Sequence, residues 1–102
     1  MSKNSLVLNL GSGKDWREDC INADIQRRIK SDWCLDIQEV HWGELLVTRL
    51  GDYRVKHEMF DVILANDILE HVPDLVKAMT NCKDLLKVGG EMRIHVPYDL
   101  SY

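Results

Sequence analysis

The stretch Leu6-Val7-Leu8-Asn9-Leu10-Gly11-Ser12-Gly13 decides the fold of this chain. Its apolar run predicts a parallel strand buried on both faces. The two glycines that follow allow the backbone to turn sharply and to approach a ligand closely. In open α/β sheets, nucleotides bind at the carboxyl ends of the strands, next to turns of this kind. Taken alone, the pattern also fits an ordinary tight turn.

Length and composition restrict the class of protein. The chain has 102 residues, of which 45% are hydrophobic and 29% charged, as expected for one globular domain. A net charge of −4 gives no support for nucleic-acid binding, which usually requires a basic face. No apolar run reaches membrane-spanning length. The three cysteines have no Cys-x-x-Cys spacing, so we expect reduced thiols in a cytoplasmic protein.

Strands and helices are expected to alternate along the rest of the chain. Apolar runs predict further strands at residues 20–25, 32–35, 60–65 and 91–96. Helical spacing of apolar residues predicts helices at 38–50 and 73–87, the second with an apolar stripe along its whole length. Pro73-Asp74 suits the start of the second helix, and Gly89-Gly90 is expected to stop it. Such strand–helix–strand units predict an α/β fold with a parallel sheet and right-handed crossovers.

Two acidic residues stand at predicted strand ends. Asp24 ends the second strand, where an acid accepts hydrogen bonds from ribose hydroxyls in dinucleotide and adenosine sites. The alternatives are a solvated loop aspartate and a cap for the segment that follows. Asp36 ends the third strand, where it either reaches an adenine amino group or caps the next helix.

Four ordered blocks of sequence resemble the class I S-adenosylmethionine-dependent methyltransferases. They are residues 8–13, 21–25, 60–63 with 69–74, and 85–90. No single block is specific, but their order is, and the resemblance covers nearly the whole chain. It implies a Rossmann-like α/β fold with a mainly parallel five-stranded sheet and flanking helices, lacking the sixth and seventh strands usual in the family. We therefore expect residues 1–102 to form a single cofactor-binding domain that is incomplete at its C-terminus.

The resemblance also implies S-adenosyl-L-methionine as the cofactor, and the residues that contact it. Gly11 and Gly13 would pass under the methionyl part, and Asp24 would hold the ribose hydroxyls. Asp36 and Ile37 would lie near the adenine. Ala65 and Asn66 would face the methionyl amino group and the substrate. The predicted contacts are completed by Asn9, Ser12 and Ile25. The family often has an acid where Asn9 stands and a third glycine where Asp15 stands.

His71 is the predicted catalytic base. Methyl transfer from a sulfonium is an in-line displacement, in which the protein positions the reactants and can accept a proton. If a helix runs through this segment, Asp67, Glu70 and His71 share one face, and that face could present a base. Some O-methyltransferases that this chain resembles bind a metal at such a place, and a purely structural entry into the next helix also fits. We predict no metal.

The predicted last strand carries charged residues on one face. Glu91, Arg93 and His95 alternate with apolar residues, so we expect one side of the sheet to be less covered. We expect His95 to be a half-exposed neighbour of the two charges and not a catalyst. The edge beside this strand is predicted to be open, and open edges invite pairing with another chain. A homodimer through this end is therefore expected.

The function predicted from the sequence is methyl transfer from S-adenosyl-L-methionine to an unidentified acceptor. The alternative is a non-catalytic module that binds S-adenosyl-L-methionine, or a partner subunit without turnover. A nicotinamide-dependent oxidoreductase is disfavoured, because its Gly-x-Gly-x-x-Gly pattern requires glycine where Trp16 stands.

Overall fold

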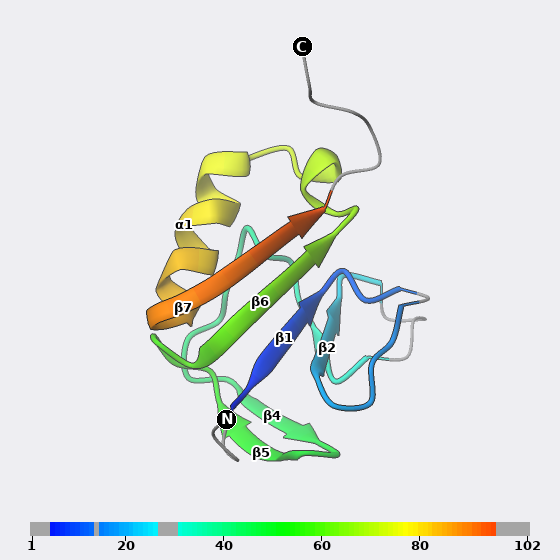
Figure 1. Ribbon diagram of the computed structural model, residues 1–102, viewed down its shortest axis with the longest axis vertical. Coiled ribbons are helices and arrows are strands. Elements are labelled where there is room, and N and C mark those ends of the chain that lie inside the picture. Colours follow the sequence, from blue (N-terminus) through cyan, green and yellow to red (C-terminus); the bar gives the residue numbers. More distant parts are fainter. Residues whose placement is uncertain (1–4, 14, 27–30, 96–102) are drawn as a thin grey trace.

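A parallel five-stranded sheet forms the centre of the molecule (Figure 1). The computed structural model describes residues 5–13, 15–26 and 31–95. The sheet order is β3-β2-β1-β6-β7, and every neighbouring pair of strands is parallel. The strands are β1 (Val7–Leu10), β2 (Ile21–Asp24), β3 (Trp33–Cys34), β6 (Phe60–Asn66) and β7 (Leu86–His95). The predicted α/β class and parallel sheet are confirmed.

The central strand β1 is buried, as its apolar sequence predicts. Leu8 pairs with Ile21 on one side and with Ile63 on the other, and all three are 0% exposed. Burying a side chain of this kind stabilises the fold by about 1.5–3 kcal/mol. The connection from β1 to β2 contains no helix, as expected for so few residues. The Gly11–Gly13 turn is therefore held directly on the central strand.

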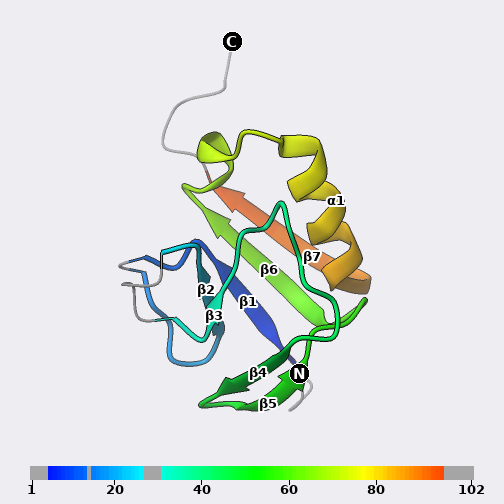
Figure 2. The ribbon, with the colours of Figure 1, turned by 180° about the vertical axis from the view of Figure 1, so that it is seen from behind.

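The helix α1 (Leu75–Leu85) covers one side of the sheet at β6 and β7 (Figure 2). Its start is confirmed, since the Asp74 carboxylate accepts the Lys77 N–H at 3.0 Å and so caps the first turn. The buried face of the helix is Ala78, Cys82 and Leu85. The predicted apolar stripe is wrong in the first turn, where Leu75 and Val76 are 48% and 78% exposed.

The prediction that Gly89-Gly90 stops α1 is wrong. The helix ends earlier, because Leu86 turns to an extended conformation and enters β7 directly. The two glycines lie inside β7, where the register shifts between the Phe60–Leu86 and Val62–Glu91 pairs. Such an irregularity suits glycine, and a Cβ on Gly90 would lie 2.8 Å from a backbone oxygen.

The predicted helix over residues 38–50 is also wrong, because its second half forms a two-stranded antiparallel hairpin. The strands are β4 (Leu45–Thr48) and β5 (Gly51–Arg54). Leu46 is buried while its neighbours Leu45 and Val47 are exposed, which is the alternation of a strand. The Thr48 hydroxyl closes the turn by donating to the Gly51 carbonyl at 2.7 Å and accepting the Leu50 N–H at 3.1 Å. Such local side-chain bonds compete with a helix.

The hairpin turn contacts the loop between β1 and β2. The Arg49 guanidinium donates to the Glu18 carbonyl at 2.8 Å and lies 4.3 Å from the centre of the Trp16 ring. A short 3₁₀ helix, η1 (Leu69–His71), links β6 to α1. None of the helices in the described ranges has the length and apolarity needed to cross a membrane.

Candidate active site

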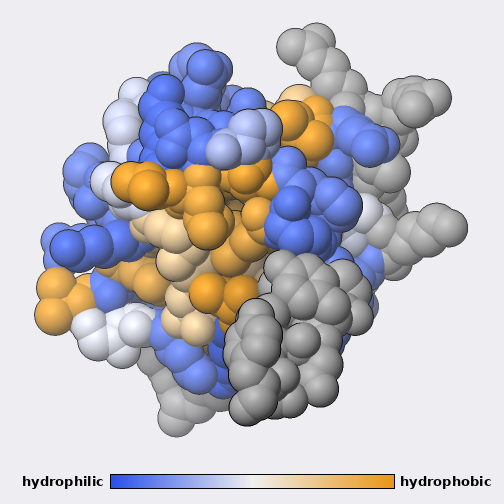
Figure 3. Space-filling view, turned by 90° about the horizontal axis from the view of Figure 1, so that it is seen from above, coloured by the Kyte–Doolittle hydropathy of each residue, from blue (hydrophilic) through white to orange (hydrophobic). Residues whose placement is uncertain are grey.

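The carboxyl ends of β1, β6 and β7 surround a cavity of about 550 Å³. This is the end of the sheet at which open α/β folds bind ligands, and small-molecule sites range over about 300–1,000 Å³. Figure 3 views the molecule from this end and shows hydrophobic side chains at the middle of the face with hydrophilic ones around them. The cavity is lined by Gly11, Ser12, Gly13, Asp15, Asn66, Asp67 and His95.

The turn after β1 requires its first glycine. Gly11 has φ +68°, and a Cβ there would lie 2.8 Å from the Ile68 side chain. Gly13 also has positive φ, at +45°. The Ser12 N–H donates to the Ala23 carbonyl at 3.0 Å, which holds the turn against β2. The turn thus combines an unusual backbone path with a close approach to the segment after β6.

The hydroxyl of Ser12 is buried within this turn. The residue is 1% exposed, and its Oγ has no hydrogen-bond partner in the described part of the chain. A buried polar group without a partner costs about 1–3 kcal/mol. A polar ligand group bound at the turn would remove that cost.

Asp24 lies directly beside the glycine turn. One carboxylate oxygen accepts the Gly13 N–H and the other accepts the Gln26 N–H, both at 2.9 Å. Each oxygen retains capacity for a further hydrogen bond. The carboxylate is therefore fixed in place and still able to accept bonds from two neighbouring hydroxyl groups.

Asn9 positions the loop after the turn. Its side-chain nitrogen donates to the Asp15 carbonyl at 2.6 Å and to the Asn22 side-chain oxygen at 3.0 Å. Both amide hydrogens are thereby used inside the protein. Asn9 is 1% exposed, so its contribution to a ligand site is to place Asp15 at the cavity wall.

Asp15 and Asn66 bring two further polar side chains to the cavity. The Asn66 amide nitrogen lies 3.5 Å from the Asp15 carboxylate, which joins the β1 loop to the end of β6. Ala65, the residue before, is fully buried in the sheet. Asp15 was not predicted as a site residue. Its position two residues after Gly13 could have indicated that it lies close to the glycine turn.

Three further predicted cofactor residues, of which Asp36 and Ile37 were expected near the adenine, are not part of the cavity wall. Ile25 is 59% exposed just after β2. The Asp36 carboxylate accepts the Gln38 N–H at 3.0 Å in a local turn. Ile37 is 3% exposed and belongs to the hydrophobic core. Their contacts with the cofactor remain a prediction.

His71 lies outside the cavity wall as well. It ends η1, its side chain is 78% exposed, and its Nε2 lies 3.3 Å from the Glu70 carboxylate. Asp67 precedes η1 at φ +56°, so a single helix does not join it to Glu70 and His71. In the described ranges, no group of three or more His, Cys, Asp or Glu side chains is arranged to hold a metal ion.

Asp67 and His95 form a pair at the cavity that sequence reasoning missed. The Nδ1 atom of His95 lies 3.0 Å from the Asp67 carboxylate, and the Asp67 N–H donates to the His95 carbonyl at 2.8 Å. His95 ends β7 and Asp67 follows β6, and these two strands are neighbours. The rule that parallel strands present their carboxyl ends at one edge could have placed them together.

The carboxylates of Asp15 and Asp67 both line the cavity, and Asp15 is also in an exposed ion pair with Arg17 at 3.1 Å, so within the described ranges Asp67 is the carboxylate there that is not paired with a guanidinium. None of the described residues that line the cavity is a cysteine. Burial raises the pKa of the Cys20 thiol to about 11, together with the charge and hydrogen bond of Asp19. Burial alone raises the pKa of the Cys82 thiol to about 11. Both are neutral thiols at physiological pH and therefore poor nucleophiles.

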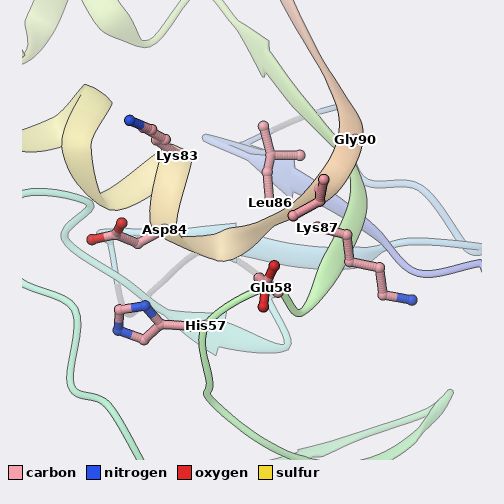
Figure 4. A pocket seen from close by; sticks show the side chains of 8 residues that line it. His57, Glu58, Lys83, Asp84, Leu86, Lys87 and Gly90 are labelled. Carbon is pink, nitrogen blue, oxygen red and sulfur yellow. The ribbon is translucent and has the colours of Figure 1, made fainter.

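A second hollow, of about 490 Å³, lies at the opposite ends of β6 and β7 (Figure 4). It is formed by His57 and Glu58 before β6, by Lys83 and Asp84 at the end of α1, and by the start of β7. The predicted cofactor residues follow the carboxyl ends of the strands, so this hollow is not the candidate site.

Known proteins resemble the chain over most of its length. The family described as "Methyltransferase domain" matches residues 8–94. The Ubiquinone biosynthesis O-methyltransferase of Pasteurella multocida is 33% identical over 81 residues, which are 78% of this chain and 34% of that protein. The protein of the same name from Dinoroseobacter shibae is 51% identical over 35 residues, covering 34% and 14% of the two chains.

A fungal protein also matches part of the chain. The Highly reducing polyketide synthase Preu5 of Preussia isomera is 40% identical over 48 residues, which are 42% of this chain and 2% of that protein. No solved structure is a significant match. The chain spans about a third of the length of the P. multocida relative.

Proposed function

The chain belongs to the class I S-adenosylmethionine-dependent methyltransferase family, and from this premise we propose that it binds S-adenosyl-L-methionine and transfers a methyl group. The observation that carries the proposal is the cavity lined by the glycine turn, together with the Asp24 carboxylate, which accepts the N–H of Gly13 in that turn. The turn, the carboxylate and the cavity all lie at the carboxyl ends of the strands, where this fold class binds nucleotides.

The described residues fit the cofactor by their chemistry. The buried Ser12 hydroxyl lacks a partner, and Asp24 can accept bonds from two ribose hydroxyls. Asp15 and Asp67 would offset the positive charge of the methionyl ammonium and the sulfonium. Asn66 would contact the methionyl end, and Ala65 would supply the close-packed strand behind it. We keep Asp36 and Ile37 as the proposed adenine side of the site, and Ile25 as a further proposed contact with the cofactor.

We propose a hydroxyl group as the methyl acceptor. The support is that relatives matching the chain are named O-methyltransferases. The bound cofactor would supply an electrophilic methyl carbon. A hydroxyl oxygen that attacks this carbon loses its proton, so the site needs a group that accepts the proton.

We further propose that residues 1–102 act as one cofactor-binding domain that self-associates through the β7 edge. One contiguous core cluster joins both halves of the described chain, which supports a single domain. In the sheet order β7 is an end strand, which supports pairing with a second copy. A cytoplasmic location is supported by the three free thiols, at Cys20, Cys34 and Cys82.

Calorimetric titration with S-adenosylhomocysteine tests cofactor binding. We expect micromolar binding to the wild type, and at least a ten-fold loss in Asp24→Ala, which is about 1.4 kcal/mol. The matched control is Asp52→Ala, which removes an exposed carboxylate from the hairpin. Equal affinity of the Asp24→Ala variant and the wild type would refute the proposed role of Asp24.

Turnover distinguishes an enzyme from a binding module. The protein is incubated with S-adenosyl-L-methionine and a series of phenols and alcohols, and release of S-adenosylhomocysteine is measured. Acceptor-dependent release supports a methyltransferase of hydroxyl groups. Tight binding with no release across the series would support the non-catalytic module instead.

A further inference from the structure

We propose that His95 is the catalytic base of this site, and that Asp67 holds it in the tautomer whose Nε2 is free to accept a proton. The proposal rests on the proposed methyl transfer to a hydroxyl group. It differs from the sequence-based prediction, which assigned this role to His71.

Position is the first argument. His95 and Asp67 line the cavity together with Gly11, Ser12 and Gly13. A base must come within hydrogen-bond reach of the proton that it removes. His71 belongs to η1 and is not part of the cavity wall.

The two residues fix each other through both backbone and side chain. The Asp67 N–H donates to the His95 carbonyl at 2.8 Å, and the His95 ring meets the Asp67 carboxylate at 3.0 Å. Asp67 also has φ +56°, a conformation that is uncommon for residues with a side chain. The pair is thus a specific arrangement at the ends of two adjacent strands.

The contact selects one form of the neutral ring. An ionised carboxylate only accepts hydrogen bonds, so the Nδ1 atom facing Asp67 must carry the hydrogen. The Nε2 atom then keeps its lone pair, as a base requires. Among the described residues His71 lacks such a bond, because its Nε2 lies 3.3 Å from the Glu70 carboxylate without hydrogen-bond geometry.

The proton and electron balance is complete with the groups present. The hydroxyl oxygen of the acceptor forms a bond to the methyl carbon as the carbon–sulfur bond breaks. S-adenosylhomocysteine leaves as a neutral thioether, and the hydroxyl proton passes to His95 Nε2. The resulting imidazolium faces Asp67, with Asp15 also at the cavity. Arg93, two residues away, is paired with Glu91 at 3.2 Å.

Nitrogen NMR of the histidine rings tests the tautomer without any acceptor. In mildly alkaline buffer we expect the His95 ring of the wild type to carry its hydrogen on Nδ1. In Asp67→Gly, which keeps the positive φ and removes the carboxylate, we expect the Nε2–H form that neutral histidine favours in water. Asp67→Asn keeps an accepting oxygen and should retain part of the wild-type preference. The His71 ring is the internal control, and its signals should be the same in the wild type and in both Asp67 variants.

Titration with S-adenosylhomocysteine then places the ring relative to the cofactor. We expect the His95 resonances and the Gly13 amide to shift along one saturation curve, while His57, in the opposite hollow, stays unchanged. A wild-type His95 ring with its hydrogen on Nε2, or one that saturating ligand leaves unchanged, would overturn the proposal. If the Gly13 amide also fails to respond, it is the proposed cofactor site that has failed.

Turnover measurements complete the test, with the acceptor that the assay of phenols and alcohols identifies. We expect His95→Asn to lower kcat by about 10²–10⁴-fold while the dissociation constant of S-adenosylhomocysteine stays within a few-fold of wild type. His71→Asn should keep most of the activity. If His71→Asn shows the large loss and His95→Asn does not, His71 is the base and the proposal is wrong.

Discussion

At the scale of single residues, Gly11 offers a sharp test of the glycine turn. We expect Gly11→Ala to destabilise the protein by about 3 kcal/mol, because the new methyl group adds a clash with Ile68 to the unfavourable positive φ. Gly43→Ala is the matched control, since φ is +91° there but the space around it is open. It should cost about 1 kcal/mol. Denaturant unfolding of both variants measures the difference, and equal losses would contradict the close approach to Ile68.

Asp61 makes the stability of the protein depend on acid. The Leu6 N–H donates to its carboxylate at 2.7 Å, and Lys87 lies 3.5 Å away. Mainly the Leu6 hydrogen bond, and then the charge of Lys87, lower the pKa of this carboxyl below its ordinary value of 3.8. Its contribution is therefore complete above the pKa of the unfolded chain and is lost as pH falls through the lower pKa of the folded state.

The melting temperature of the wild type should fall as the pH is lowered from about 4, because Asp61 becomes protonated there. We expect a smaller fall in the Asp61→Asn variant, which has no carboxylate to protonate. Melting curves at a series of pH values measure it. Parallel pH profiles for the two proteins would mean that Asp61 does not contribute to the acid sensitivity.

At the scale of elements, Arg49 connects the turn of the β4–β5 hairpin to the loop between β1 and β2, in addition to the packing of Leu46 in the core. We expect Arg49→Ala to destabilise the protein by about 1 kcal/mol, because it removes the contact with the Trp16 ring and the bond to the Glu18 carbonyl. Hydrogen exchange of the β4 and β5 amides should become faster. Arg54→Ala is the control, since Arg54 bonds within its own segment, to Gly43. Equal effects of the two variants would contradict a docking role for Arg49.

The same hairpin shows why element prediction failed in one place. Val40, Leu45, Leu46 and Leu50 have helical spacing. Leu45 and Leu46 also fit the two faces of a strand, and Leu50 fits the turn that follows it. Thr48 and Gly51 decided between the two, through hydrogen bonds that close a turn. The strands β1 and β6 were predictable because most of their residues are apolar and buried, with Asn9 and Asp61 as the polar exceptions inside the two runs.

At the scale of the whole molecule, the outer edge of β7 is self-complementary in charge. If two copies pair in antiparallel fashion about Met92, Glu91 of each copy lies opposite Arg93 of the other. We expect Glu91→Arg to weaken the dimer roughly ten-fold, because both pairs become repulsive. The Glu91→Arg/Arg93→Glu double variant should restore association. Sedimentation at micromolar concentrations measures it, and a wild type that stays monomeric would refute the dimer.

The site was predictable only where one segment contains its own signal. Gly11, Gly13 and Asp24 follow strands whose sequence marks their ends, and the structure brings these residues together. The Asp67–His95 pair depends on the register between β6 and β7, which the bulge at Gly89-Gly90 alters. The strand-end rule places both residues at one edge of the sheet, but only the register decides that their side chains meet. Asn9 shows the same limit, since its amide is used by Asn22 on the neighbouring strand.

The sheet order also has a consequence for how the protein comes to be folded. The cavity is bounded by the turn after β1, near the start of the chain, and by the last residue of β7, near its end. A nascent chain on the ribosome therefore has no complete cavity until residue 95 has been synthesised. Contacts between such distant segments also slow folding. Cofactor capture during synthesis would then mark the moment at which the last strand docks.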